Sequence, residues 1–257
     1  MKKIVLSSFA AAALAVGSTH AQTIASDNGG NYSGGWTNGA NGGTGFLGWS
    51  ISAGGGTGGF GGNIIGDPAS AGISGMNTSS FGLFANPSGS GAFANADRSL
   101  AAPLATGNIF SFQWSINFDS GSTGNKGFNL YTGAPGTGEI VNVNNGGSSA
   151  ITFNGTDIGF SYGVNAMTWT FTQLSPTSLG LSVNGRDGSG LFTTNISGLA
   201  GPVNSFRFYA SDLQAGDSAQ PYFNNLTVVV PEPSTYALLT LSALALGGYA
   251  ARSRARK

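Results

Sequence analysis

The chain of 257 residues has no cysteine, has a single histidine, and devotes only 8% of its residues to charged side chains. The lack of cysteine excludes thiolate catalysis, thiolate metal ligation and stabilisation by disulfides. The single histidine, His20, lies in a segment that we expect to be removed, which leaves the mature chain without an imidazole. Ser-His-Asp catalysis, histidine general-base catalysis and the usual zinc sites are therefore excluded as well.

The first residues have the pattern of a secretory signal peptide. Lys2 and Lys3 precede an apolar run from Ile4 to Val16, and small residues stand where a signal peptidase cuts. We predict a signal-peptide helix within residues 1–21, cleavage after Ala21, and export of the remaining chain.

Residues 22–230 carry nine acidic and four basic side chains, a net charge of −5. Binding to nucleic acid requires a basic face that can neutralise phosphates. We therefore expect no nucleic-acid partner.

Residues 22–62 form a glycine-rich N-terminal segment, with sixteen glycines among the thirty-four residues from Gly29 to Gly62. Ordering glycine costs more backbone entropy than ordering other residues, so we expect mostly loop, with at most a short strand over residues 46–51. A phosphate-binding loop is excluded because no Gly-Lys-Ser/Thr follows.

Residues 63–230 read as a body of short strands. Phe110, Phe112 and Trp114 alternate with polar residues, which predicts a strand with one buried face. The other predicted strands lie at residues 81–84, 128–131, 151–153, 167–171, 179–183, 206–209 and 226–230, with turn-rich sequences between them. We expect an all-β fold, an antiparallel β-sandwich like a jelly roll, with its most secure hairpin over residues 179–192 turning at Asn184-Gly185.

The last 27 residues, 231–257, have three parts in order. Pro231, Glu232 and Pro233 stop the last strand, an apolar helix-forming run covers residues 236–251, and a basic tail contains Arg252, Arg254, Arg256 and Lys257. The sixteen-residue run is just under the usual transmembrane length of about 17–25 residues. Basic residues after it predict a cytoplasmic C-terminus during membrane insertion.

This segment resembles a PEP-CTERM sorting signal, which has a Pro-Glu-Pro motif, a transmembrane-like helix and an arginine-rich end. The resemblance implies recognition at residues 231–233 by an exosortase, which releases the body or transfers it to another envelope component. It also implies a Gram-negative host that makes exopolysaccharide. The body resembles, more loosely, the glycine-rich and concanavalin A-like β-sandwich domains that precede such signals, through residues 110–133 and 205–234.

Two classes of function remain open. The first is a structural or adhesive protein of the cell surface or extracellular matrix that associates with exopolysaccharide. In that case Trp36 and Trp49 are candidates for stacking on sugar rings, although tryptophans between glycines also commonly cover the end of a sheet.

The second class is a glycan hydrolase or lyase on the same scaffold, which needs a pair of carboxyl groups. Glu139 is the only glutamate in the body and has no aspartate within ten residues, while Asp119 and Asp157 stand beside turn sequences. We therefore expect a protein that is not an enzyme.

No cofactor is implied by the sequence. Calcium is the remaining candidate, with oxygen ligands from residues 184–190, Asp212 and Asp217. The EF-hand spacing is absent, and turn formation also explains these residues.

Overall fold

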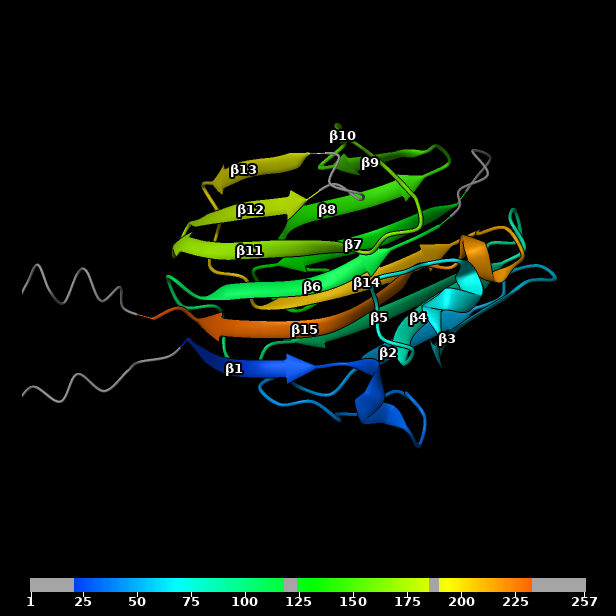
Figure 1. The fold of residues 1–257 in the computed structure, drawn as a ribbon, viewed down its shortest axis with the longest axis horizontal. Coiled ribbons are helices and arrows are strands. Elements are labelled where there is room, and N and C mark those ends of the chain that lie inside the picture. Colours follow the sequence, from blue (N-terminus) through cyan, green and yellow to red (C-terminus); the bar gives the residue numbers. More distant parts are fainter. Residues whose placement is uncertain (1–20, 118–123, 185–189, 233–257) are drawn as a thin grey trace, which may run out of the picture. The chain divides into compact units, whose positions relative to one another are not determined.

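The computed structural model describes residues 21–117, 124–184 and 190–232 (Figure 1). These residues form strands and short 3-10 helices, with no α-helix among them. The predicted helix of the signal peptide, the apolar run 236–251 and the basic tail 252–257 lie outside the described residues. Within the described part of the chain, no helix is long and apolar enough to cross a membrane.

Residues 23–231 form one compact unit built from two sheets (Figure 1). The eight-stranded sheet has the order β13 (Leu191–Ser197), β12 (Ser178–Asn184), β11 (Met167–Ser175), β6 (Ile109–Ser115), β15 (Tyr222–Val230), β4 (Ser80–Asn86) and β3 (Phe60–Gly66), and β1 (Gln22–Asp27) also pairs with β15. The seven-stranded sheet has the order β10 (Thr156–Ser161), β9 (Ala150–Phe153), β8 (Glu139–Gly146), β7 (Asn125–Tyr131), β14 (Ser205–Ser211), β5 (Phe93–Ser99) and β2 (Ser50–Gly54). The 3-10 helices are η1 (Gly29–Tyr32), η2 (Pro68–Ala71) and η4 (Asp217–Ala219).

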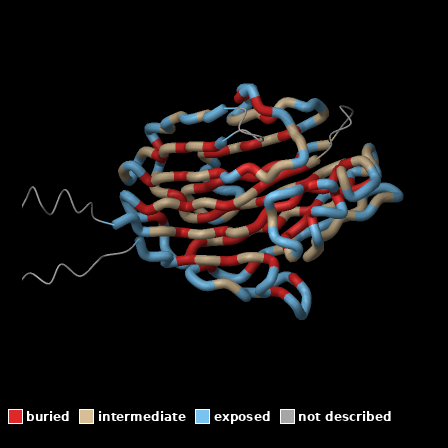
Figure 2. Tube along the Cα trace, viewed as in Figure 1, coloured by how far each residue is buried: buried red, intermediate tan, exposed pale blue. Residues whose placement is uncertain are grey.

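The core lies between the sheets and is mainly aromatic. In strands such as β6, β11 and β12, alternate residues point inward, so buried and partly exposed positions alternate along the chain trace (Figure 2). Phe208 of the seven-stranded sheet stacks on Phe223 of the eight-stranded sheet with ring centroids 3.7 Å apart. Phe112 and Phe128 meet edge to face at 4.8 Å. Aromatic burial on this scale stabilises the fold without disulfides.

The predicted antiparallel sandwich is confirmed. The strand predicted from the alternation of Phe110, Phe112 and Trp114 is β6. Strands β11 and β12 form an antiparallel pair in which Phe171 lies opposite Leu181. The predicted hairpin is also present, since Val183 of β12 lies opposite Phe192 of β13. Its turn residues 185–189 lie outside the described residues.

Residues 29–62 are mostly loop, as expected, but the strand expected over residues 46–51 is β2 (Ser50–Gly54), and β3 begins at Phe60. Strand β3 runs across the predicted boundary at residue 62. Glycine here permits close approach between chain segments. At Gly45, φ is +71° and an added Cβ would stand 2.3 Å from the carbonyl oxygen of Ile24 in β1.

Candidate functional site

The outer face of the seven-stranded sheet gathers polar side chains from six strands. In β14, Phe206 and Phe208 point into the core, so Arg207 and Tyr209 point outward. Residues that lie opposite one another on neighbouring strands form two rows across this face. The row through Arg207 contains Ser50, Asp97, Arg207, Asn129 and Asn142. The row through Tyr209 contains Ser52, Asn95, Tyr209, Gly127, Asn144 and Thr152.

This face is hollowed by two adjoining cavities of about 350 and 490 Å³, which we call the polar groove. Both cavities are lined by Glu139, Asn142 and Asn144 of β8. The first extends over β7, β14 and β5, and the second over β9 to the turn at Asn154-Gly155. The groove therefore crosses the strands rather than running along one of them.

Arg207, which lines the groove, forms an ion pair with Asp97 of β5. Arg207 Nε donates to Asp97 Oδ1 at 2.6 Å and Arg207 Nη2 donates to Asp97 Oδ2 at 2.9 Å. This two-point contact raises the pKa of Arg207. Both oxygens of Asp97 are therefore occupied by the guanidinium.

Glu139 is the second carboxylate of the groove. Its Oε2 accepts a hydrogen bond from Asn129 Nδ2 at 2.9 Å, and its Oε1 accepts a longer one from Asn142 Nδ2 at 3.4 Å. The spacing of carboxylates along the sequence gave no sign of a partner for Glu139. The nearest acidic side chain on this face that the structure adds is Asp97 of β5, which does not line the groove itself but pairs with Arg207, which does.

The side chain of Tyr209 extends across the neighbouring strand β7 and reaches β8, because Gly127 of β7 has no side chain in its way. The Tyr209 hydroxyl donates to the carbonyl oxygen of Val143 in β8 at 3.0 Å. A Cβ on Gly127 would stand 1.8 Å from that oxygen and 2.9 Å from the Tyr209 hydroxyl. Burial raises the pKa of Tyr209, so its hydroxyl stays protonated and keeps this hydrogen bond.

Trp36 and Trp49, the residues predicted to contact sugar, are 4% and 1% exposed. They meet edge to face in the core, with centroids 5.3 Å apart, and both contact Phe81. The prediction of sugar stacking is therefore wrong for these two residues. The glycines around them fold the segment back onto the sandwich, which buries the rings.

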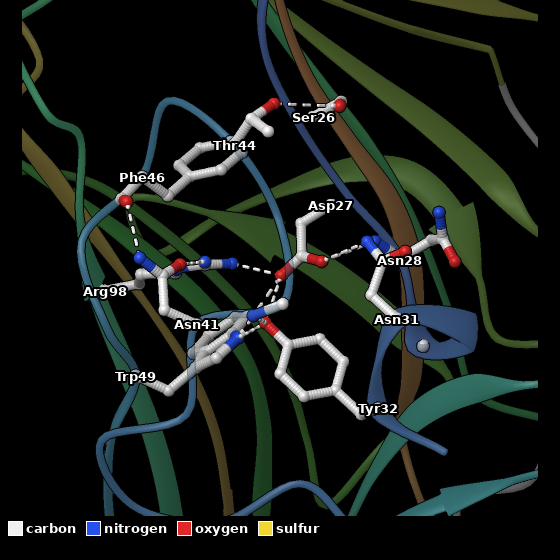
Figure 3. Close-up of polar contacts among 12 residues, drawn as sticks. Ser26, Asp27, Asn28, Asn31, Tyr32, Asn41, Thr44, Phe46, Trp49 and Arg98 are labelled. Carbon is white, nitrogen blue, oxygen red and sulfur yellow. Dashed lines mark hydrogen bonds and ion pairs between the residues drawn. The ribbon is translucent and has the colours of Figure 1, made fainter. Parts of the chain in front are cut away.

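Trp49 also belongs to a buried polar cluster that joins the glycine-rich segment to β5 (Figure 3). Arg98 pairs with Asp27, and both side chains are fully buried. Tyr32 donates to Asp27 Oδ2 at 2.6 Å, and Trp49 Nε1 donates to the Tyr32 hydroxyl at 2.9 Å. The Arg98 guanidinium also lies 4.8 Å from the Phe46 ring centroid, so its charge is surrounded by partners.

Asp157 and Asp212 accept hydrogen bonds from backbone N–H groups, Asp157 within β10 and Asp212 from the distant segment before β5. Asp157 Oδ1 accepts from the backbone N–H of Gly159 at 2.8 Å, and Asp212 Oδ1 accepts from that of Gly91 at 2.7 Å. Asp119 and most of the residues 184–190 lie outside the described residues. Among the described residues, no group of three or more His, Cys, Asp or Glu side chains could hold a metal ion.

The sorting residues are only partly described. Pro231 and Glu232 follow β15 and are exposed, and Glu232 Oε1 accepts from the backbone N–H of Ala21 at 3.1 Å. Pro233 and the basic residues Arg252, Arg254, Arg256 and Lys257 lie outside the described residues.

No family model matches the chain, and no curated protein matches it. Among solved structures, the chain is similar to the VIP36 exoplasmic/lumenal domain in a Ca²⁺/Man3GlcNAc-bound form, with 7% identity, a TM-score of 0.40, and coverage of 71% of this chain and 83% of that one. A legume lectin-like domain from Entamoeba histolytica has 11% identity, a TM-score of 0.38, and coverage of 60% and 84%. The ligand binding domain of botulinum neurotoxin serotype D, in complex with N-acetylneuraminic acid, has 14% identity, a TM-score of 0.41, and coverage of 71% and 45%. These likenesses are remote, so the groove has to be judged by its own residues.

Proposed function

We propose that the protein is exported to the cell envelope or extracellular matrix and binds carbohydrate in the polar groove. The observation that carries this proposal is the double row of amide, carboxylate, guanidinium and phenol groups on the outward face of one sheet. Sugars present hydroxyl groups that both donate and accept hydrogen bonds, which planar amides and carboxylates match. Because these groups stand on paired strands, they are held in place before a ligand arrives.

The charge of the groove favours a neutral glycan. The positive charge of Arg207 is neutralised by its ion pair with Asp97. The negative charge of Glu139, which lines the groove, is therefore not compensated. A polymer of uronic acids would place further carboxylates near Glu139, where like charges repel. A neutral sugar meets no such repulsion and can form hydrogen bonds with the asparagine side chains that line the groove, Asn95, Asn129, Asn142 and Asn144.

The groove also favours binding over hydrolysis. Glycoside hydrolysis requires one carboxyl group to protonate the leaving oxygen and another to act as nucleophile or base. Asp97 is held at both oxygens by Arg207, and Glu139 accepts from two amides. We therefore propose that the protein is not an enzyme. A hydrolase or lyase remains the second candidate, because Glu139 lines the groove and a second carboxylate, Asp97, contacts Arg207, which also lines it.

The binding test compares two asparagines. The whole chain, purified in mild detergent, is titrated by calorimetry with neutral polysaccharides and with uronate-containing ones. Asn142→Ala should weaken binding of the neutral glycan three- to tenfold, because one hydrogen bond contributes about 0.5–1.5 kcal/mol. Asn195→Ala, at an exposed position of β13 on the other sheet, should bind like the wild type.

Three results would count against this proposal. The first is no binding to any glycan, and the second is equal loss in the two asparagine variants. The third is release of reducing ends that Glu139→Gln abolishes, which would establish the hydrolase instead.

Export and sorting form the second part of the proposal, and the two chain ends support it. The protein would lose residues 1–21, remain briefly in the membrane through residues 236–251, and be processed by an exosortase at residues 231–233. Glu232→Ala should leave unprocessed protein in the membrane fraction on an immunoblot, while Glu139→Ala in the body should be processed normally. Processing of Glu232→Ala at the wild-type rate would refute the sorting role.

A further inference from the structure

Phe93 is the exposed aromatic residue of the polar groove. Among the described residues, the aromatic side chains that line the groove are Phe93, Tyr131 and Tyr209. Tyr131 is buried, and Tyr209 lies across β7 with its hydroxyl bonded to β8. Phe93 is 39% exposed, and its ring makes no contact with another aromatic ring in the described part of the chain. Phe93 is therefore the ring that the groove offers to a ligand.

Phe93 begins β5 and lies at one end of the groove. Ala94 and Ala96 are buried, so Phe93 and Asn95 point outward on the face that carries the groove. Strand β5 is the last strand that the groove reaches on this side, and the groove extends in the other direction to the turn beyond β9. A ligand that contacts Phe93 can thus continue across the other strands of the sheet.

A glycine in the edge strand makes room for the Phe93 ring. Gly54 of β2 lies directly opposite Phe93. A Cβ on Gly54 would stand 2.6 Å from Cε1 of the ring. The ring therefore occupies the space that any other residue at position 54 would fill with its own side chain. This packing restricts the ring before a ligand arrives, which lowers the entropy cost of binding.

Polar groups adjoin the ring on the side of the groove. Ser211 of β14 lies directly opposite Phe93, and Asn125 of β7 lies directly opposite Ser211. Asn95 follows on the same face of β5, about 7 Å along the strand.

A pyranose ring matches this combination. Its C–H bonds form an apolar face, and its hydroxyl groups lie around the rim. The partly positive C–H groups pack favourably on the negative face of an aromatic ring, while the hydroxyl groups find donors and acceptors beside it.

The distance from Phe93 to the far end of the groove sets the size of the ligand. The strands follow in the order β5, β14, β7, β8 and β9, which gives four strand spacings. Neighbouring strands lie about 4.8 Å apart, so the groove extends over about 19 Å. One sugar unit of an extended glycan is about as long as one strand spacing. A glycan that reaches from Phe93 to β8 and β9 therefore contains several units.

We propose that the groove takes a linear neutral oligosaccharide of about four sugar units, with one pyranose ring stacked on Phe93 and the chain continuing across β14, β7 and β8. This inference rests on the proposed function, since it requires that glycans bind in the groove. It adds a stacking residue and a minimum chain length. Phe93 takes the role that was predicted for Trp36 and Trp49, whose rings lie in the core.

The experiment measures how affinity depends on the length of the glycan. The whole chain, in mild detergent, is titrated by calorimetry with linear glucan, mannan and xylan oligomers of increasing length. Wild-type affinity for the glycan that binds should rise with each added unit up to about four and then stay constant. In Phe93→Ala the rise should end one unit earlier, about three- to tenfold below the wild type, because the stacking contact is lost. Phe60→Ala removes an exposed ring from β3 in the other sheet and should bind like the wild type.

Gly54→Ala tests the position of the ring without changing a residue that lines the groove. Its Cβ displaces the Phe93 ring, so this variant should also lose the gain from the last sugar unit, whereas Phe93→Tyr keeps the ring and should retain it. Affinity that does not depend on chain length, or equal affinity of Phe93→Ala and the wild type for the longest oligomers, would overturn this inference and leave glycan binding in the groove intact. Absence of binding to every glycan would overturn both.

Discussion

At the scale of single residues, Tyr131 shows how the groove combines burial with charge. It is 2% exposed and lies opposite Glu139 in the neighbouring strand. Burial raises its pKa to about 12, Arg207 acts in the opposite direction, and Glu139 and Asp97 add to the rise. The charged phenolate is therefore unfavourable in the folded protein.

This shift predicts how stability depends on pH. The folded protein holds the Tyr131 proton up to pH of about 12, whereas the unfolded chain releases it near pH 10. The free energy of unfolding should thus be unaffected by Tyr131 below about pH 10. It should fall by roughly 3 kcal/mol between about pH 10 and 12, at about 1.4 kcal/mol per unit.

Urea denaturation at a series of alkaline pH values measures this dependence. Tyr131→Phe has no proton to lose, so its stability should fall less steeply over the same range than that of the wild type. Burial also raises the pKa of Tyr32, Tyr209 and Tyr222, so some loss should persist in the variant. An identical pH dependence in the two proteins would show that Tyr131 titrates normally.

At the scale of elements, the Asp27–Arg98 pair is what attaches the glycine-rich segment to the sandwich. It joins the end of β1 to β5, and Arg98 Nε also donates to the carbonyl oxygen of Leu47 at 2.7 Å. A buried ion pair adds little stability compared with apolar packing, but removing one partner leaves the other charge buried and unpaired.

Asp27→Asn should therefore destabilise the protein by about 3–5 kcal/mol in urea denaturation. Asp157→Asn, at an exposed position of β10, should change stability by less than about 0.5 kcal/mol. The double variant Asp27→Asn with Arg98→Met should recover part of the loss, because the unpaired charge is gone. If Asp27→Asn is as stable as the wild type, the pair does not hold the segment in place.

The elements differ in how clearly the sequence indicated them. Strand β6 was predictable because bulky apolar residues alternate with polar ones along it. Strand β5 was not, because its inward positions are Ala94, Ala96 and Arg98, two small residues and a charge. Alternation indicates a strand only where the buried side chains are large and apolar.

At the scale of the whole molecule, the polar groove depends on which strands are neighbours. Asn95, Arg207 and Glu139 come from β5, β14 and β8, and β14 reaches its place between β5 and β7 only through the order of the sheet. No local spacing relates these residues. The alternation of Asn142 and Asn144 with Val141 and Val143 was the one local sign of a wet face on β8.

The sequence by itself determined the chemistry that the body lacks and its fold class. The absence of cysteine, and of histidine after residue 20, is a property of composition, and strand alternation is a local property of the chain. The tertiary structure alone decided that Trp36 and Trp49 are buried and that Arg207 of β14 and Glu139 of β8 line one groove. These outcomes depend on contacts between segments distant in the sequence, which cross-strand register and packing of the whole sandwich create.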